Sequence, residues 1–457
     1  MTTNKERYSI FGVILGACIL CSLLQTVMNT ALPAVMAEFA INAATAQWLT
    51  SGYSLAMGVM TPLTAFLIKR FPTKRLFSVA LIICCAGVAL AVWAGSFPVL
   101  MCGRILQAIG ASVIASMTQV VIFHIFPAEK RGSIMGMYGL AVGAAPILAP
   151  TLAGVVIDLW GWRMVFGISL AIAAVAVVLG IWMMRNVLPT QRLNFDFLSM
   201  AECSLGLTGI MIGLGNITSH PFFGVFVALP LLIGAVSLVL FWKRQQALEE
   251  PYLNLQLFKN REFTCGTIGS MLLYAGMIGA SSLIPLYVQS VRGLSAMVSG
   301  VVTMPGSLVM IFINPIAGKL YDKMGIRKLF LTGSALMLAG CLGLSFLTME
   351  TPLLWVVTLF VIRQIAVGVV MMPLATWAMS SMEKSATADG TAILASLRTI
   401  AGSIGAAVFV SLSSSVAANA AQIDGINAAF MGISAVAAAE LLFAVYLARK
   451  PKVAMKG

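Results

Sequence analysis

Acidic and imidazole side chains are scarce in this 457-residue sequence, which has 15 Asp and Glu residues together and only two His residues. It contains no Gly-rich phosphate-binding loop, and its His and Cys residues form no cluster with catalytic spacing. Cys18 and Cys21 have C-x-x-C spacing, but no His or carboxylate lies near them to complete a metal shell. We therefore expect no enzymatic activity, no metal site, no cofactor and no use of ATP by this chain.

Long polar stretches are absent as well, since 60% of the residues are hydrophobic and only 9% are charged. A helix needs an apolar run of about 20 residues to cross a hydrocarbon layer of ~30 Å. The breaks between such runs predict an all-α polytopic membrane protein, embedded in a lipid bilayer. Its fourteen transmembrane helices are expected over residues 10–32, 48–68, 76–96, 98–121, 133–157, 163–184, 197–216, 221–242, 263–288, 299–320, 328–347, 352–374, 397–416 and 427–447.

The net charge of +13 would by itself suggest a nucleic-acid partner. With the N-terminus placed inside, however, nearly all of the 28 Lys and Arg residues fall at the termini or in the loops of one side. The exceptions are Arg104, Arg163, Arg292 and Arg363. This asymmetry is the positive-inside pattern of membrane proteins. We therefore expect both termini in the cytoplasm and no nucleic-acid partner.

An internal repeat relates the two halves of the chain. The segments "TPLTAFLIKRFPTKRLF" from Thr61 and "NPIAGKLYDKMGIRKLF" from Asn314 align without gaps, and "GRILQAIGA" around Arg104 resembles "VIRQIAVGV" around Arg363. Such repeats are typical of transporters whose site lies between two homologous halves. We expect two pseudo-symmetric six-helix bundles at residues 1–188 and 251–457, with two inserted transmembrane helices at residues 189–250.

Five segments in a fixed order resemble the major facilitator superfamily. They are "TVMNTALP", "QWLTSGYSL", "GRILQAIGA", "GAAPILAPTLAGVVIDLWGWRMVF" and "GKLYDKMGIRK". Within that superfamily the chain is similar to the fourteen-helix drug:proton antiporters of bacteria, especially the multidrug and lincomycin-efflux type. The resemblance implies a multi-pass protein of the bacterial cytoplasmic (inner) membrane that works by alternating access.

The same resemblance implies a conformational latch in the repeated loops. The second copy keeps the glycine, acid and base of the family signature, at Gly318, Asp322 and Arg327. The first copy has Lys69 at the place of the acid but keeps the charge of the loop through Lys69 and Arg70. A latch through Lys69 therefore needs another partner, such as Glu129. The alternative is that these basic residues only set the orientation in the membrane.

Helix 133–157 resembles the antiporter signature of the family through Pro146, Pro150 and Gly154. Small residues permit close helix packing, and proline prevents continuous backbone bonding, so such a helix can bend between the two halves. By resemblance the pattern favours export over import. The alternative is that Gly and Pro are simply common in spanning helices.

Arg104 lies inside the fourth predicted helix, and Gln107, Ser112 and Gln119 follow it on one polar or small face. An arginine in the membrane costs at least ~2.5 kcal/mol on insertion scales, so it must be paired or hydrated. The face predicts a cavity wall, and the resemblance implies that Arg104 couples protons to substrate. The alternative is a structural arginine that binds helix-end carbonyls.

The repeat gives Arg104 a counterpart in the second half. Arg363 and Met371 are expected either to line the substrate cavity or to serve packing, and we assign Tyr274 to the cavity as well. Methionine side chains adapt to varied ligands, although they are also ordinary fillers of helix bundles.

Gln25 and Asn29 share one face of the first predicted helix. The segment resembles that of proton-coupled family members, and the resemblance implies an acid at position 24 or 25. Here position 25 is Gln, whose amide can donate and accept hydrogen bonds but never ionise. Three hypotheses stay open: coupling is lost at this site, it has moved to another acid such as Glu202 or Glu440, or the chain is a variant in which Glu was replaced.

These observations predict a secondary active exporter of amphipathic or hydrophobic compounds, antibiotics included, that exchanges them for protons. The alternatives are an uncoupled facilitator, an exporter coupled to another ion, and a membrane sensor that binds ligand without transporting it.

Overall fold

The structure is a computed structural model of the chain that describes residues 4–41, 43–191, 196–217, 223–248, 251, 253–294, 296–418 and 420–449. These residues form α1 (Asn4–Phe39), α2 (Ala43–Arg70), α3 (Thr73–Val92), α4 (Phe97–Ile125), α5 (Ala128–Trp160), α6 (Trp162–Met183), α7 (Phe197–Asn216), α8 (Val225–Ala247), α9 (Arg261–Leu286), α10 (Ala296–Met324), α11 (Ile326–Leu344), α12 (Leu353–Ser380), α13 (Thr387–Ala417) and α14 (Gln422–Arg449). Three short helical segments are η1 (Leu255–Lys259), η2 (Tyr287–Val291) and η3 (Lys384–Ala386).

The apolar composition explains why the described chain is helical. Inside a bilayer every backbone N–H and C=O must be bonded within the protein, and an α-helix does this locally. Thirteen of the fourteen α-helices, all except α5, are long and apolar enough in their described residues to cross a membrane. The prediction of an all-α polytopic membrane protein is confirmed.

Two groups of six helices have matching internal packing. In the first bundle (α1–α6), α3 packs on α4 and α6, α2 on α4, and α1 on α5. In the second bundle (α9–α14), α11 packs on α12 and α14, α10 on α12, and α9 on α13. Adding eight to the helix numbers of each pair in the first bundle gives a pair that also packs together in the second bundle. This correspondence is the predicted pseudo-symmetry. The exact boundaries at residues 188 and 250 stay predictions.

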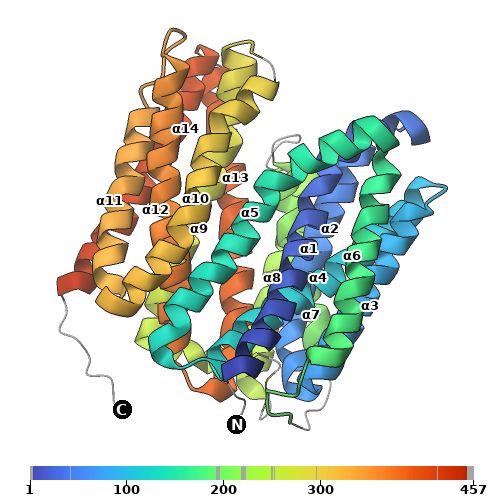
Figure 1. Cartoon of the computed structure of the whole chain (residues 1–457). Coiled ribbons are helices and arrows are strands. Elements are labelled where there is room, and N and C mark those ends of the chain that lie inside the picture. The colour runs from blue at the N-terminus through green and yellow to red at the C-terminus, as the bar shows by residue number, and fades with distance from the viewer. Residues whose placement is uncertain are drawn as a thin grey trace.

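The bundles meet along α5 with α10 and along α2 with α13. In Figure 1 they converge toward the bottom and diverge toward the top. The inserted pair, α7 and α8, packs against itself and is attached to α2 and α13 rather than to one bundle alone.

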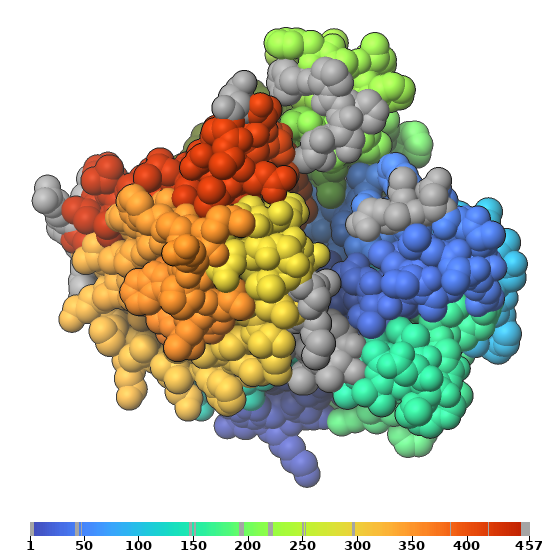
Figure 2. All heavy atoms as spheres, turned by 90° about the horizontal axis from the view of Figure 1, so that it is seen from above, coloured from blue at the N-terminus to red at the C-terminus, as the bar shows by residue number. Residues whose placement is uncertain are grey.

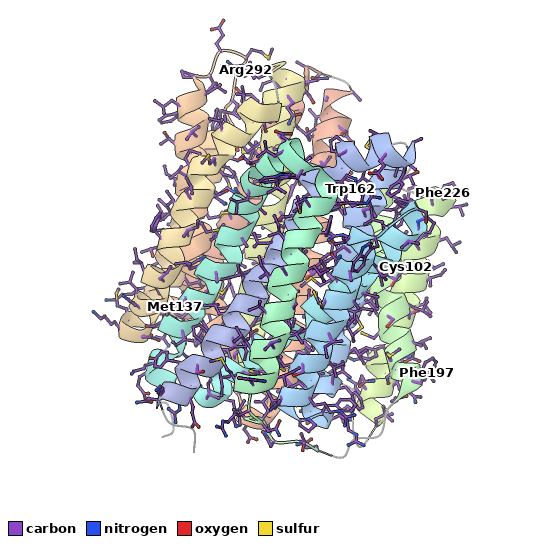
Figure 3. The ribbon with its side chains drawn as sticks, turned by 45° about the vertical axis from the view of Figure 1, so that its right-hand side comes forward. Cys102, Met137, Trp162, Phe197, Phe226 and Arg292 are labelled. Carbon is purple, nitrogen blue, oxygen red and sulfur yellow. The ribbon has the colours of Figure 1, made fainter. Side chains whose placement is uncertain are left out.

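The two ends of the molecule differ in charge. The last turn of α2 carries Lys69 and Arg70, and the first turn of α11 carries Arg327 and Lys328; we call this end of the molecule the basic end. Figure 3 shows Phe197 toward this end and Trp162 and Arg292 toward the opposite end. Apolar side chains on the outer faces of α6 and α8 are exposed, as a lipid-facing surface requires.

Near the basic end, one buried apolar cluster spans both bundles. It contains Phe66 of α2 and Val121 of α4 together with Met379 of α12 and Ala392 of α13. A second cluster lies within the second bundle. Seen from the opposite end, the two bundles present separate surfaces with a recess between them (Figure 2).

One ion pair holds the inserted helices to each other. Asp196 caps α7 by accepting hydrogen bonds from the amides of Leu198 and Ser199. Arg244 of α8 donates to both Asp196 carboxylate oxygens, at 3.0 and 2.9 Å. These hydrogen bonds, above all those from Arg244, lower the pKa of Asp196 to about 2.

This pKa predicts an acid-dependent contribution to stability. Because the folded pKa lies below the unfolded value of about 3.9, the contribution is fully present above that value and is lost as pH falls toward 2. Asp196→Asn keeps the cap but removes the charge, so it should lower the melting temperature at pH 6, and the gap to the parent protein should close as pH falls toward 2. A gap that stays constant with pH would contradict this account.

Candidate functional site

A cavity of about 510 Å³ lies between the two bundles. Its wall is built by α1, α2, α4 and α5 of the first bundle, α9, α12 and α13 of the second, and Met211 of α7. Five residues that the sequence assigned to the site lie on this wall: Gln25, Ser112, Gln119, Tyr274 and Met371. The structure therefore brings together side chains that are up to 346 positions apart (371 − 25).

Two polar residues expected in the cavity do not line it. Asn29 lies on α1, where its Oδ1 accepts a hydrogen bond of 3.1 Å from Thr50. Gln107 is buried between α3 and α4, where its Nε2 donates to the Gly87 carbonyl oxygen at 3.0 Å. Helical spacing correctly selected a polar face of α4, but part of that face packs on another helix and only part reaches the cavity.

Arg104 is fully buried behind the cavity wall. It donates to the carbonyl oxygens of Leu24 at 2.8 Å and Leu49 at 3.1 Å, and its guanidinium lies 4.3 Å from the centre of the Tyr53 ring. These contacts join α1, α2 and α4, as the structural alternative requires. One guanidinium nitrogen, Nη2, has no hydrogen-bond partner among the described residues. A coupling role for Arg104 stays a prediction.

Arg363 repeats this arrangement in the second bundle. It is fully buried and donates to the Met277 carbonyl oxygen at 2.6 Å, to Ser281 at 3.3 Å and to Gln364 at 3.2 Å. It does not line the cavity, so the packing alternative describes it better than the cavity assignment does. A buried guanidinium needs acceptors, and in both bundles neighbouring helix carbonyls supply them.

Arg398 is a cavity residue that the sequence patterns did not reveal. The thirteenth helix was expected to start at residue 397, so Arg398 fell at its very end and was grouped with the basic residues of the adjoining loop. The helix α13 in fact begins at Thr387, and Arg398 lies one third of the way along it and on the cavity wall. Its guanidinium carbon lies 4.8 Å from the centre of the Tyr274 ring. The Ala-rich stretch after Asp389 contains no proline, and this was the available signal for an earlier helix start.

The two acids proposed for proton transfer lie away from the cavity wall. Glu440 of α14 is only 1% exposed and accepts a hydrogen bond of 3.4 Å from Ser334 of α11. Glu202 lies on α7, and its Oε2 is buried without a hydrogen-bond partner among the described residues. Neither position connects directly to the substrate cavity, so their role in coupling stays a prediction.

Lys69 does form a contact between the bundles, but with a different partner from the one suggested. Its Nζ lies 2.5 Å from Oδ2 of Asp389, in the first turn of α13. Lys69 is 17% exposed and Asp389 only 2% exposed. Glu129 was a natural candidate by its place in a neighbouring loop, but the distant Asp389 approaches because α2 packs along α13.

Asp322 makes the equivalent contact on the other side of the interface. Its carboxylate accepts from the amides of Gly132 and Ser133 at 2.8 and 2.7 Å, and from the Ser133 hydroxyl at 2.5 Å. The helix backbones are very close here, since a Cβ at Gly318 would clash with the Gly132 carbonyl oxygen. Glycine at position 318 is therefore required for this approach.

The side chains that the two repeats contribute to these contacts have opposite charge. Lys69 and Asp322 occupy equivalent positions in the repeat, 253 residues apart (322 − 69). A carboxylate suits the start of a helix, where the dipole is positive, whereas a lysine there is repelled. Asp389 in the first turn of α13 offsets that repulsion and gives Lys69 a partner. We call the two contacts together the basic-end clasp.

Of the remaining residues proposed for gating, Arg70 and Arg327 form no ion pair in the described part of the structure. Arg70 is exposed and Arg327 is partly buried at the basic end. A Cβ at Gly154 would meet no atom within 4 Å, so close helix packing does not explain this glycine. Pro146 and Pro150 lie in the unbroken helix α5, but their side chains are outside the described part of the structure.

Comparison with known proteins identifies the family. The family model described as Major Facilitator Superfamily matches residues 14–406 of the chain. The chain belongs to the Major Facilitator Superfamily. Several of the relatives that it matches are named as transporters, and none of those named below is named as an enzyme.

Relatives of this superfamily member include the MFS-type transporter YcnB of Bacillus subtilis, 35% identical over 98% of this chain and 96% of YcnB. The lincomycin resistance protein LmrB of Listeria innocua is 32% identical over 85% of this chain and 83% of LmrB. Among solved structures, the human organic anion transporter MFSD10 has a TM-score of 0.71 at 14% identity, covering 96% of this chain and 99% of that chain. This last likeness shows the superfamily fold alone.

The clasp predicts how charge changes alter the conformation of this superfamily member. Asp389→Asn should favour separation of the bundles at the basic end, because removing one partner of a buried ion pair costs on the order of 3 kcal/mol. The double variant Lys69→Asp with Asp389→Lys should restore closure only in part, since it puts a cation at the start of α13.

Spin labels at the exposed positions Arg75 and Lys328 would report the separation by pulsed electron resonance. Cys102, an exposed native cysteine, is first replaced by Ser. Surface Lys243→Gln serves as a control that removes one charge elsewhere. An unchanged distance distribution in Asp389→Asn would show that the ion pair does not hold the end closed.

Proposed function

We propose that this protein is a secondary active exporter of amphipathic or hydrophobic compounds, antibiotics included, driven by proton antiport. The observation that carries the proposal is a drug-sized cavity between two bundles that are clasped at one end. Alternating access requires such a site together with a closure that can be released. The lincomycin resistance relatives add support for the kind of substrate.

The proposed place is the bacterial cytoplasmic membrane, with both termini and the basic end in the cytoplasm. In this orientation the clasp closes the cytoplasmic side, and the structure corresponds to an outward-facing state. An exporter in that state releases its substrate outside and must then break the clasp to load the next molecule.

Proton antiport requires a group that carries the proton. The cavity wall contains no Asp or Glu among the described residues, and Gln25 stands where the resemblance to proton-coupled antiporters implies an acid. This observation favours a second candidate, a facilitator without proton coupling. If coupling exists, the buried Glu440 is the better placed of the two proposed carriers, since it is shielded from water and has a hydrogen-bond donor in Ser334.

Proteoliposomes with an imposed pH gradient separate the two candidates. Efflux of an amphipathic dye that depends on the gradient and stops with a protonophore supports antiport. Gradient-independent movement supports the facilitator. Binding without any flux would refute both and leave the sensor.

Gln25→Glu tests the role of the amide in helix α1. If coupling was lost at this site, the variant should gain efflux that rises severalfold with the pH gradient, because the new carboxyl can bind and release a proton inside the cavity. Glu440→Gln, in the parent chain, should abolish gradient dependence if coupling has moved to Glu440. An unaltered gradient dependence in both variants would contradict both locations.

A further inference from the structure

The described residues of the cavity wall carry charge of one sign only, which is positive. Among the described residues that line it, Arg398 is the one with a charged side chain, and none is Asp or Glu. The ion pairs in the described part of the chain do not include Arg398. The cavity between the bundles therefore contains a cation without a protein counter-ion.

Arg398 differs in this respect from the other two arginines inside the membrane. Arg104 and Arg363 donate mainly to helix carbonyls and do not reach the cavity, although Nη2 of Arg104 and Nε of Arg363 also lack a partner among the described residues. Arg398 contacts the ring of Tyr274 through its face, and its Nε is buried without a hydrogen-bond partner among the described residues. Stacking on a ring orients the guanidinium but leaves its in-plane N–H donors free.

The rest of the wall suits a planar apolar body. Met57, Met371 and Ile278 provide soft apolar surface, and Tyr53 and Tyr138 provide aromatic surface. Methionine and aromatic side chains adapt to ligands of varied shape. A guanidinium binds a carboxylate through two parallel hydrogen bonds, which is a specific and strong arrangement.

We propose that the substrates of this cavity are amphipathic organic anions, whose carboxylate binds Arg398 while an aromatic or aliphatic body lies against the methionines and tyrosines. The inference rests on the proposed transport function and narrows its substrate class. A partly buried cation without a counter-ion is incompletely solvated, so an anionic ligand that neutralises it gains more than a neutral one of the same shape. A cationic compound is repelled.

Binding of a matched pair of probes tests this proposal. Tritiated pyrene-1-butyrate and pyrene-1-butanamide share one apolar body and differ in the carboxylate. Saturable binding is measured on the full chain in lipid nanodiscs, with empty nanodiscs subtracted. The parent protein should bind the carboxylate about tenfold more tightly than the amide.

Variants assign the preference to Arg398. Arg398→Gln should bind the two probes equally, Arg398→Lys should keep part of the preference, and surface Lys243→Gln should keep all of it. Gln25→Glu should weaken carboxylate binding, since it adds a negative charge to the wall. Equal binding of both probes by the parent, or an unchanged preference in Arg398→Gln, would overturn the proposal.

The outcome is separable from that of the transport experiment. A carboxylate preference without gradient-driven flux supports the substrate class and refutes the exporter. Gradient-driven flux of neutral dyes by a protein with no carboxylate preference supports the exporter and refutes the substrate class.

Discussion

The basic-end clasp joins the two bundles at one end, and the proposed access to the cavity from the opposite end alone depends on it. Two contacts of opposite charge form this clasp: Lys69 with Asp389, and Asp322 with the start of α5. Both are polar contacts at the margin of a bilayer, where they are stronger than in water yet still reversible. A purely apolar closure would need no such pairing, and it would also lack the polar groups through which charge or water can release it.

The three arginines inside the helices show that neighbours decide what a charge does. Arg104 and Arg363 donate to carbonyl oxygens of adjacent helices, and these hydrogen bonds join helices within each bundle. Arg398 faces the cavity and stacks on Tyr274 instead. Two of these arginines therefore hold helices together, whereas the third, Arg398, is available to a ligand. Since Gln25 adds no negative charge to the wall, the positive charge of Arg398 is not balanced there.

Sequence patterns predicted the helical membrane fold and the two related bundles, because hydropathy and helical spacing act locally along the chain. Four of the seven residues assigned to the substrate cavity lie on its wall. These patterns did not predict contacts between distant segments. Lys69 lies 320 residues from Asp389, and no spacing rule relates them. The prediction that Gln107 lines the cavity was wrong for a similar reason. Periodicity shows which face of α4 is polar but not which neighbouring helix covers that face. Arg398 was missed because hydropathy placed the start of α13 ten residues late.

The most direct test of the account is the side from which the cavity is reached. With the eight native cysteines replaced by Ala, Ser403→Cys puts one thiol on the cavity wall. We predict that a membrane-impermeant maleimide labels it faster in right-side-out vesicles than in inside-out ones. Adding Gly318→Leu, which separates α10 from α5, should speed labelling in inside-out vesicles, while Gly300→Leu on the same helix should not. Labelling at equal rates from both sides in the parent, or from neither, would contradict a cavity closed by the clasp.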